Sequence, residues 1–313
     1  MHRMHTTTRR EFIGRSLPKA GLAAAIPFLA GCSTTQTKPH SFAGSDKVAL
    51  GRTGITTSRL AQGTGYNGWA RSSDHTRMGK AAFERLLRHS LENGITFIDM
   101  ADLYGTHPFV RDVIKGGRRD KLTLLSKIWV RKEDWVTPSG GAKEEVDRFR
   151  RELDTDVIDI CLIHCATDAK WADEYARVRD ELSELKQKRV VRAVGVSCHD
   201  LGALRVAATH PWTEVIFARI NNRGGQDYSM DGATDVVSDV LRTARRNGKA
   251  VVGMKIFGAG KLTKPQEKDT SLEYVFRNDL VDAVTIGMKT PEEVDDTLMR
   301  MSALRRRISQ SPA

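Results

Sequence analysis

Eight short apolar segments alternate with eight segments of helical periodicity from Lys47 onward, and this order restricts the fold of the 313-residue chain more than any other feature. The apolar segments lie at 59–63, 95–99, 121–127, 157–164, 190–197, 214–220, 250–255 and 281–286. The helical segments lie at 77–92, 108–115, 143–154, 171–187, 200–208, 233–247, 271–277 and 291–303. Regular alternation is typical of βα units around a parallel sheet, and eight such units predict a closed (β/α)8 TIM barrel. A β-hairpin from Val48 to Ser58, with GRTG at its turn, is expected to precede the barrel.

The composition of the N-terminal segment differs from that of the predicted barrel. TRREFI, at 8–13, leads into the apolar run GLAAAIPFLAGC, which ends at Cys32. The twin arginine resembles a twin-arginine export signal, and LAGC resembles a lipobox whose cysteine is acylated after cleavage. A run of about a dozen apolar residues is too short to span a bilayer. The sequence therefore predicts an export signal over 1–31, a polar tether over 32–46 and the barrel over 47–313.

These features predict export by the twin-arginine route to the periplasm, with Cys32 as the lipid anchor and the only contact with the membrane. The alternative is an amphipathic N-terminal helix on a cytoplasmic protein. Residues 1–31 carry a net charge of +4, so their removal lowers the formal net charge from +11 to +7. The remaining basic residues are spread over helical segments without interleaved aromatic residues, which speaks against nucleic acid as a partner. Nothing in the sequence predicts an oligomeric state.

The cysteines that follow Cys32 are few. Cys161, Cys165 and Cys198 are irregularly spaced, so they predict no disulfide framework.

The segment GTGYNG, from Gly63 to Gly68, has the G-x-G-x-x-G spacing of a dinucleotide-binding turn. That turn should open directly into a helix and be followed about 20 residues later by an acidic residue. Here Gly68 continues into WARSSDHTR, and Asp99 lies 36 residues after Gly63. The glycines are therefore interpreted as the loop that leaves the first barrel strand, where backbone can approach a ligand closely.

Four polar residues lie at or just after the ends of successive predicted strands, the positions where barrels of this class carry their active sites. Asp99 ends the second strand and Tyr104 follows five residues later, in IDMADLYG. Lys127 ends the third strand and His164 ends the fourth. A lysine at the end of an apolar strand is costly unless it is paired, and Asp99 on the adjacent strand is a suitable partner.

The segments D-x-A-D-x-Y-G, the strand that ends at Lys127, DTDVIDICLIH, GVS at 195–197 and the glycine loop GTGYNG together resemble the aldo-keto reductase family in order and spacing. The resemblance implies that Tyr104 is the general acid, that Lys127 and Asp99 support it electrostatically, and that His164 orients and polarises a carbonyl group. A nearby ammonium is expected to lower the pKa of the Tyr104 phenol toward the working pH. The implied activity is interconversion of a carbonyl compound (aldehyde, ketone or sugar) and its alcohol.

The same resemblance implies a set of residues that bind a nicotinamide cofactor. They are Gly63, Thr64, Gly65, Ser197, Cys198, Met254, Gly258, Gly260, Gly287, Met288, Lys289, Asp296 and Thr297. Cys198 replaces the usual asparagine, Phe217 the usual glutamine, and Met254 the usual aromatic residue, so the nicotinamide pocket is atypical. Lys289 could meet a 2′-phosphate, which favours NADP(H) over NAD(H).

Several alternatives stay open at this stage. A zinc site formed by His164, Cys165, Cys198 and His199 is disfavoured, because strand alternation would point His164 and Cys165 to opposite faces. No metal is predicted. His107 is either a substrate contact or a solvated loop residue. A non-catalytic nucleotide-binding envelope lipoprotein and a metal-dependent hydrolase are the rival functions. The loop KLTKPQEKDT after the seventh barrel strand is short, which predicts an open cleft for small polar carbonyls or sugars.

Overall fold

The computed structural model describes residues 42–115, 119–130 and 141–310, with side chains described through residue 304. The predicted export signal, Cys32 and most of the predicted tether lie outside these residues. The chain divides into two units, Met1–His40 and Ser41–Ala313, and the described residues belong to the second.

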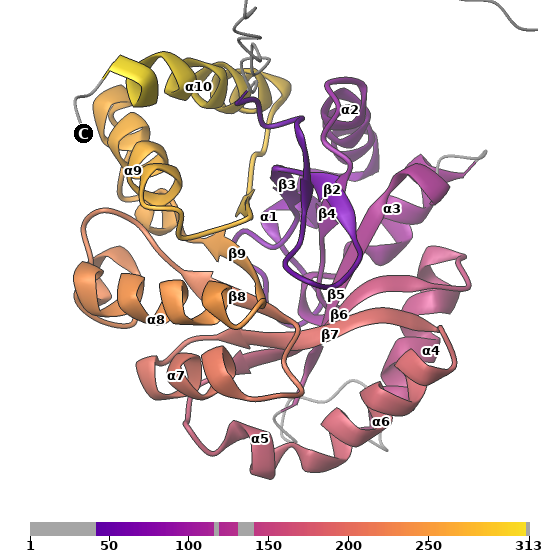
Figure 1. Ribbon diagram of the computed structural model, residues 1–313. Helices are drawn as coiled ribbons and strands as arrows, with labels where there is room; N and C mark the ends of the chain where they lie inside the picture. Colours follow the sequence, from indigo (N-terminus) through magenta and orange to yellow (C-terminus); the bar gives the residue numbers. More distant parts are fainter. Residues whose placement is uncertain (1–41, 116–118, 131–140, 311–313) are drawn as a thin grey trace, which may run out of the picture. The chain divides into compact units, whose positions relative to one another are not determined.

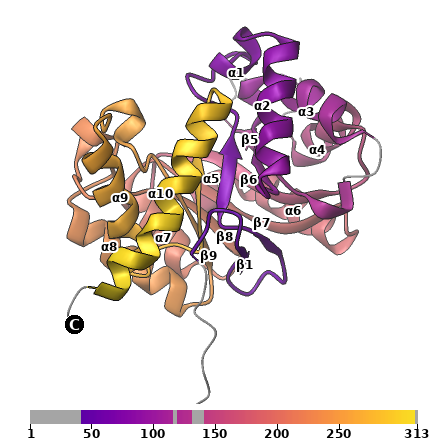
Figure 2. The same cartoon turned by 90° about the horizontal axis from the view of Figure 1, so that it is seen from above.

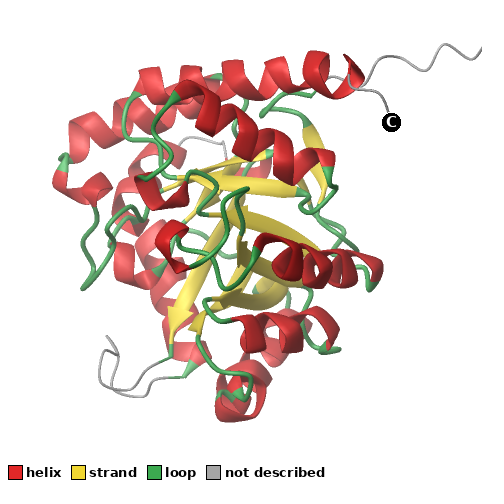
Figure 3. Ribbon diagram, turned by 90° about the vertical axis from the view of Figure 1, so that its left-hand side faces the viewer, coloured by secondary structure: helices red, strands yellow, loops and turns green. Residues whose placement is uncertain are grey.

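The second unit contains a closed barrel of parallel strands in the order β10-β3-β4-β5-β6-β7-β8-β9 (Figures 1 and 3). These strands are β3 Leu60–Gly63, β4 Phe97–Asp99, β5 Thr123–Trp129, β6 Ile158–Ala166, β7 Val191–Cys198, β8 Val215–Arg219, β9 Ala250–Met254 and β10 Ala283–Ile286. Each lies within a few residues of a predicted strand. Helices surround the strands in Figure 3. The predicted TIM barrel is therefore confirmed.

The helices follow the strands in the expected order. They are α1 Asp74–Arg77, α2 Lys80–Glu92, α3 His107–Ile114, α4 Ala142–Leu153, α5 Trp171–Glu174, α6 Ala176–Gln187, α7 Leu201–Thr209, α8 Thr234–Arg246, α9 Pro265–Arg277 and α10 Pro291–Gln310. No helix among the described residues is both long enough and apolar enough to cross a bilayer.

One helix differs from the prediction in a way that affects the site. Helix α9 begins at Pro265, six residues before the predicted start at 271. Proline occupies its first turn, and the Lys264 backbone N–H donates to the Glu267 carboxylate at 3.1 Å. Both features favour a helix start. Much of KLTKPQEKDT is therefore helical, and the prediction of an irregular loop there was wrong.

The predicted hairpin is present and closes one end of the barrel. Strands β1 Lys47–Ala49 and β2 Thr56–Ser58 pair antiparallel. The loop between them places Leu50 and Ile55 in the apolar cluster that fills the barrel interior, and the Arg52 backbone N–H donates to the Gly248 carbonyl at 3.0 Å, just before β9 begins. The hairpin therefore covers the end at which the strands start. Figure 2 shows the barrel from a second direction.

The chain already packs on the barrel five residues before the predicted domain boundary. The Phe42 ring lies edge-on to the Phe276 ring, with 4.9 Å between centroids, and the Arg59 guanidinium lies 4.2 Å from the centroid of Phe42. The Leu60 N–H donates to the Gly44 carbonyl at 2.8 Å. Residues 42–46, which were assigned to the tether, thus contact the domain.

Candidate active site

A cavity of about 470 Å³ opens at the end of the barrel opposite the hairpin, where the strands finish. This volume falls in the range of small-molecule sites. Residues at the ends of β3, β4, β5, β6, β7, β9 and β10 line it. The predicted catalytic residues Asp99, Tyr104, Lys127 and His164 all belong to its wall. The strand-end argument therefore located the cavity correctly.

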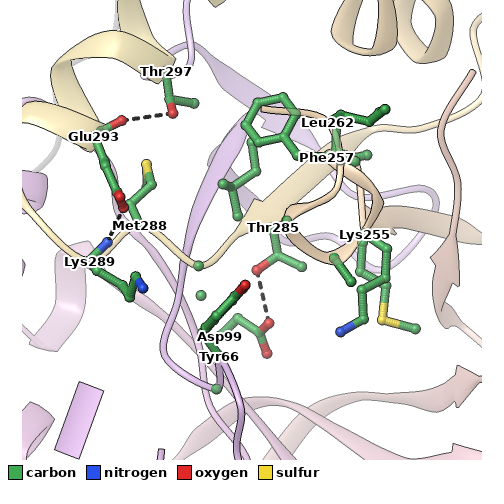
Figure 4. Close-up of a pocket in the computed structure, with 18 of the residues that line it drawn as sticks. Tyr66, Asp99, Lys255, Phe257, Leu262, Thr285, Met288, Lys289, Glu293 and Thr297 are labelled. Carbon is green, nitrogen blue, oxygen red and sulfur yellow. Dashed lines mark hydrogen bonds between the residues drawn. The ribbon is translucent and has the colours of Figure 1, made fainter. Parts of the chain in front are cut away.

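Asp99 and Lys127 form a buried ion pair on neighbouring strands. The Lys127 ammonium donates to Asp99 Oδ1, and it also donates to the Met100 carbonyl at 2.9 Å. The other carboxylate oxygen, Asp99 Oδ2, accepts a hydrogen bond of 2.9 Å from the Thr285 hydroxyl (Figure 4). Both charged groups are almost fully buried, so each holds the other in one position.

Tyr104 reaches the cavity from the short 3-10 helix Asp102–Tyr104, which follows β4. Its ring packs closely against two glycines of the GTGYNG loop, so a Cβ atom at Gly65 or at Gly68 would overlap the ring. The Lys127 Nζ atom lies 4.9 Å from the centroid of the Tyr104 ring. Gly65 and Gly68 thus make room for the tyrosine, a role that differs from the backbone approach to a ligand proposed for this loop.

The pKa of Tyr104 moves in the direction opposite to the prediction. Burial raises the pKa of the phenol well above 10, and the carboxylates of Asp99 and Asp102 raise it further. The pKa is raised although the Lys127 ammonium, which is paired with Asp99, lies beside the ring. Tyr104 therefore stays protonated at neutral pH and retains a proton to donate.

His164 stands beside Tyr104 at the end of β6. The two rings are 5.8 Å apart, edge to face, and the Trp129 ring lies 5.5 Å from His164 on another side. Burial lowers the pKa of His164 well below 6.5, and the neighbouring Lys127 charge lowers it further. The imidazole is therefore neutral at physiological pH. Its Nδ1 atom is buried and has no hydrogen-bond partner among the described residues.

The contact between Gly65 and Tyr104 gives a first prediction. Gly65→Ala is expected to push the Tyr104 ring from its position and to lower the free energy of unfolding by about 1–3 kcal/mol, the usual cost of overpacking. Urea unfolding monitored by circular dichroism would measure this. Gly232→Ala is the control, because its added methyl would meet only ordinary contacts at 3.5 Å and 3.7 Å. Equal stability of the two variants would contradict the proposed packing role.

Most of the residues predicted to bind the cofactor line the same cavity. Those on its wall are Gly63, Gly65, Ser197, Met254, Gly260, Gly287, Met288, Lys289, Asp296 and Thr297. Thr64, Cys198 and Gly258 are not on it. The Thr64 hydroxyl instead donates to the Asp99 carbonyl at 2.8 Å, and Gly258 adopts φ +58° in a buried turn.

Cys198 does not reach the position expected of it. Its side chain is fully buried in the apolar layer between the barrel and the helices, whereas Ser197 and His199 line the cavity. Successive residues of a strand point to opposite faces, so Cys198 follows the outward series and its two neighbours the inward series. The residue that faces the cavity here is His199.

The cavity wall also contains residues that the sequence argument did not single out. They include Tyr66, Lys255, Phe257, Leu262, Lys268, Thr285 and Glu293. Thr285 belongs to the end of β10, so the rule that found Lys127 could have found it, whereas Lys255 follows the last residue of β9, where alternation points it away from the cavity. Tyr66, Lys268 and Glu293 come from a loop and from helices, where no comparable spacing rule exists.

One side of the cavity combines cations, acids and glycine backbone. Figure 4 shows Lys289, Glu293 and Thr297 together on the side formed by α10. The Lys289 N–H donates to the Glu293 carboxylate at 2.6 Å, and Lys268 lies 3.5 Å from Asp296. Lysine side chains and backbone N–H groups are the usual partners of phosphate oxygens, so this side is suited to phosphate groups.

His107 has a structural role. It begins α3 and is almost fully buried; its Nδ1 atom lies 2.8 Å from the Glu152 carboxylate and its Nε2 atom 2.9 Å from the Ser126 hydroxyl. Because both ring nitrogens are engaged, neither is available to a substrate. The solvated loop position that was the alternative prediction is also wrong.

Zinc ligation at the β6 and β7 ends was disfavoured from the sequence. Across the described ranges, no group of three or more histidine, cysteine, aspartate or glutamate side chains is arranged to hold a metal ion. Cys165 adopts φ +64° at an irregularity in the pairing of β6 with β7, so the simple alternation assumed for His164 and Cys165 does not hold there.

Fold and site together define a TIM-barrel protein with a tyrosine, a histidine and a buried lysine–aspartate pair around one cavity. The model of the Aldo/keto reductase family matches residues 59–275. The chain belongs to the aldo/keto reductase family.

Similarities to individual proteins agree with this assignment. The aldo-keto reductase YhdN of Bacillus subtilis (strain 168) is 30% identical over 164 residues, which cover 48% of this chain and 46% of that protein, so the match spans about half the length of this relative. The holo form of an aldo-keto reductase from Bacillus halodurans has a TM-score of 0.65 and 20% identity, over 87% of this chain and 96% of that chain. An aldo-keto reductase from Klebsiella pneumoniae in complex with NADPH has a TM-score of 0.61 and 19% identity, over 85% of this chain and 96% of that chain. At these identities the two structures support the shared fold.

Proposed function

We propose that the protein is an NADP(H)-dependent oxidoreductase that interconverts a small carbonyl compound, such as an aldehyde, a ketone or a sugar, and its alcohol. The observation that supports this most strongly is the convergence of Tyr104, His164 and the Lys127–Asp99 pair on one cavity that also carries a phosphate-compatible side. Family membership and the NADPH complex of the Klebsiella pneumoniae relative agree with it.

The residues present fit such a cofactor. Lys268 and Lys289 are candidates to hold phosphate groups, and the backbone around Gly260 and Gly287 can approach a ligand because these residues have no side chain. The bound cofactor would supply or accept the hydride. Ser197 and Met254 line the region near the catalytic residues and are candidates to contact its reactive end.

The catalytic residues then have separate tasks. Tyr104 donates a proton to the oxygen of the carbonyl group as it is reduced, and takes one back when the alcohol is oxidised. The neutral His164 can donate an N–H hydrogen bond to the same oxygen without bringing a second positive charge next to Lys127. Lys127 places a positive charge beside the tyrosine, while Asp99 and the Met100 carbonyl fix its ammonium.

A direct test of this proposal starts with cofactor binding. Purified barrel domain would be titrated with NADPH and with NADH, each followed by fluorescence, and then assayed at 340 nm with a panel of aldehydes, ketones and sugars. Tighter binding of NADPH and oxidation of NADPH that depends on an added carbonyl are expected. A protein that binds NADPH but turns over none of the panel would favour the nucleotide-binding alternative, and a protein that binds neither nucleotide would overturn the proposal.

A second prediction concerns the pH dependence of reduction. His164 has a pKa well below 6.5 and Tyr104 a pKa well above 10, so neither changes its protonation between about pH 7 and about pH 9. The maximal rate of NADPH-dependent reduction is therefore expected to vary by less than about twofold across this range. Initial rates at saturating NADPH in buffers of constant ionic strength would measure it. A rate that falls with rising pH, with the midpoint of the fall inside this pH range, would mean that the titration of another group limits the reaction.

We further propose, from the motifs around Arg9-Arg10 and Cys32, that the protein is exported by the twin-arginine route and anchored in the periplasm by a lipid on Cys32. The test is fractionation of cells that express wild type, an Arg9→Lys/Arg10→Lys variant and a Cys32→Ala variant. The first variant is expected to stay in the cytoplasm and the second to be released from the membrane. A paired-arginine variant that reaches the envelope as wild type does would overturn the proposed route.

A further inference from the structure

Four lysines line the cavity, and one of them differs from the others in its surroundings. Lys127 is paired with Asp99, Lys268 lies 3.5 Å from Asp296, and Lys289 lies 3.6 Å from Asp74. The ammonium of Lys255 makes neither a hydrogen bond nor an ion pair within residues 42–115, 119–130 and 141–304. A ligand that fills the cavity would displace the water around this cation, and an unpaired cation is costly to desolvate.

The backbone turns Lys255 into the cavity against the rule of strand alternation. Met254 is the last residue of β9 and lines the cavity, so regular alternation would point Lys255 outward. Instead Lys255 adopts φ +59°, in the left-handed region that is unfavourable for a residue with a side chain. Its carbonyl accepts hydrogen bonds from the Gly258 N–H at 2.8 Å and from Asn221 Nδ2 at 3.2 Å. These bonds hold a backbone conformation that is unfavourable for residues other than glycine.

Figure 4 shows the result. The Lys255 amine extends toward the middle of the cavity, the side on which Asp99 and Thr285 lie, and it stands apart from Lys289 and Glu293. Strain of this kind at a cavity wall is a reason to look for a function of the residue that it positions.

The charges around Lys255 leave its position electropositive. Lys255 is exposed to solvent in the cavity, and partial desolvation by the surrounding wall lowers the pKa of its ammonium; Arg219 and Lys127 act in the same direction, and Asp99 and Cys165 oppose them. Asp99, the carboxylate that acts on this group, is already engaged by Lys127 and Thr285, and Asp231 is engaged by Arg219. A negatively charged ligand group would find no competing carboxylate free to bind Lys255.

We propose that Lys255 is an anion-binding residue of this cavity, which pairs with a phosphate or carboxylate oxygen of a bound ligand. The proposal rests on the proposed function, and two sources would supply that oxygen. One is the diphosphate of the nicotinamide dinucleotide, and the other is a carboxylate or phosphate group on the carbonyl substrate.

The test compares Lys255→Met with Lys255→Arg and with Lys261→Met. Lys261 lies in the same segment and is exposed, but it does not line the cavity, so its variant removes the same charge outside the site. The first arm measures the Kd of NADPH by fluorescence titration. The second arm measures binding of benzoate and of benzyl alcohol to the NADP⁺-loaded protein by calorimetry; the two probes differ in the charge of one group.

Lys255→Met is expected to weaken one of these interactions by at least about tenfold, the effect of losing one hydrogen bond to a charged group. Weaker NADPH binding identifies the cofactor as the source, and weaker benzoate binding with unchanged benzyl alcohol binding identifies the substrate. Lys255→Arg should retain most of the affinity, and Lys261→Met should match wild type. Unchanged affinity of Lys255→Met in both arms, or an equal loss in Lys255→Arg, would overturn the inference. Failure of wild type to bind NADPH would instead overturn the proposed function.

Discussion

Tyr104→Phe is expected to lower the rate of carbonyl reduction by about 100-fold or more, while the Kd of NADPH changes by less than about twofold. The variant loses only the hydroxyl, because the phenylalanine ring can occupy the same space against Gly65 and Gly68. General acid catalysis by a positioned side chain commonly contributes 10²–10⁴-fold, and Tyr104 lies beside His164 in the cavity wall.

The matched control is Tyr274→Phe, which removes a hydroxyl that lies 2.8 Å from the Ser238 hydroxyl and does not line the cavity. Steady-state rates at saturating NADPH would compare the two variants, and fluorescence titration would compare their affinities. Near wild-type turnover of Tyr104→Phe would show that the proton comes from another group. Loss of NADPH affinity in the same variant would show that Tyr104 has a role in binding.

Lys127→Met is expected to abolish measurable reduction and to lower the free energy of unfolding by about 3–5 kcal/mol. Lys127 and Asp99 are only 2% and 6% exposed, so removal of the lysine leaves a carboxylate buried without its cation. Urea unfolding would measure the stability, and the assay at 340 nm the activity.

A double variant separates the two effects. Lys127→Met with Asp99→Asn removes both charges, and the asparagine can still accept the hydrogen bond that Thr285 donates. Most of the lost stability should return, because replacing both partners of a buried pair is far less costly than removing one. Activity should stay absent. A single variant as stable as wild type would contradict the description of a buried pair, and recovery of turnover in the double variant would contradict the catalytic role of Lys127.

The barrel and its four candidate catalytic residues could be predicted from the sequence because they depend on features with a fixed period. Alternation of apolar strands and helices defines the βα units, and the strand ends define the side of the barrel on which Asp99, Lys127 and His164 lie. The start of α9 at Pro265 was missed although a proline in the first turn favours a helix start, and α10, which begins at Pro291 as predicted, carries a proline at the same position.

Whether an individual side chain points into the cavity or toward the outer helices was harder to predict. A one-residue difference in register reverses the direction of a side chain, which is why Cys198 lies in the outer core and His199 in the cavity. Cys165 and Lys255 adopt positive φ at strand ends, where no period applies. The pKa of Tyr104 also depends on burial and on the competition between Lys127 and Asp99, which no spacing rule describes.

The hairpin at the closed end of the barrel has a practical consequence for handling the protein. Leu50 and Ile55 plug the end where the strands begin, and Phe42 and Gly44 pack beside the start of β3. A tag, a solid support or a fusion partner joined ahead of Phe42 would therefore attach at the end remote from the cavity. Immobilised through its N-terminus on a sensor chip, the barrel would present its open end to the analyte, so surface-based titrations of NADPH and of carbonyl compounds could be made without blocking the site.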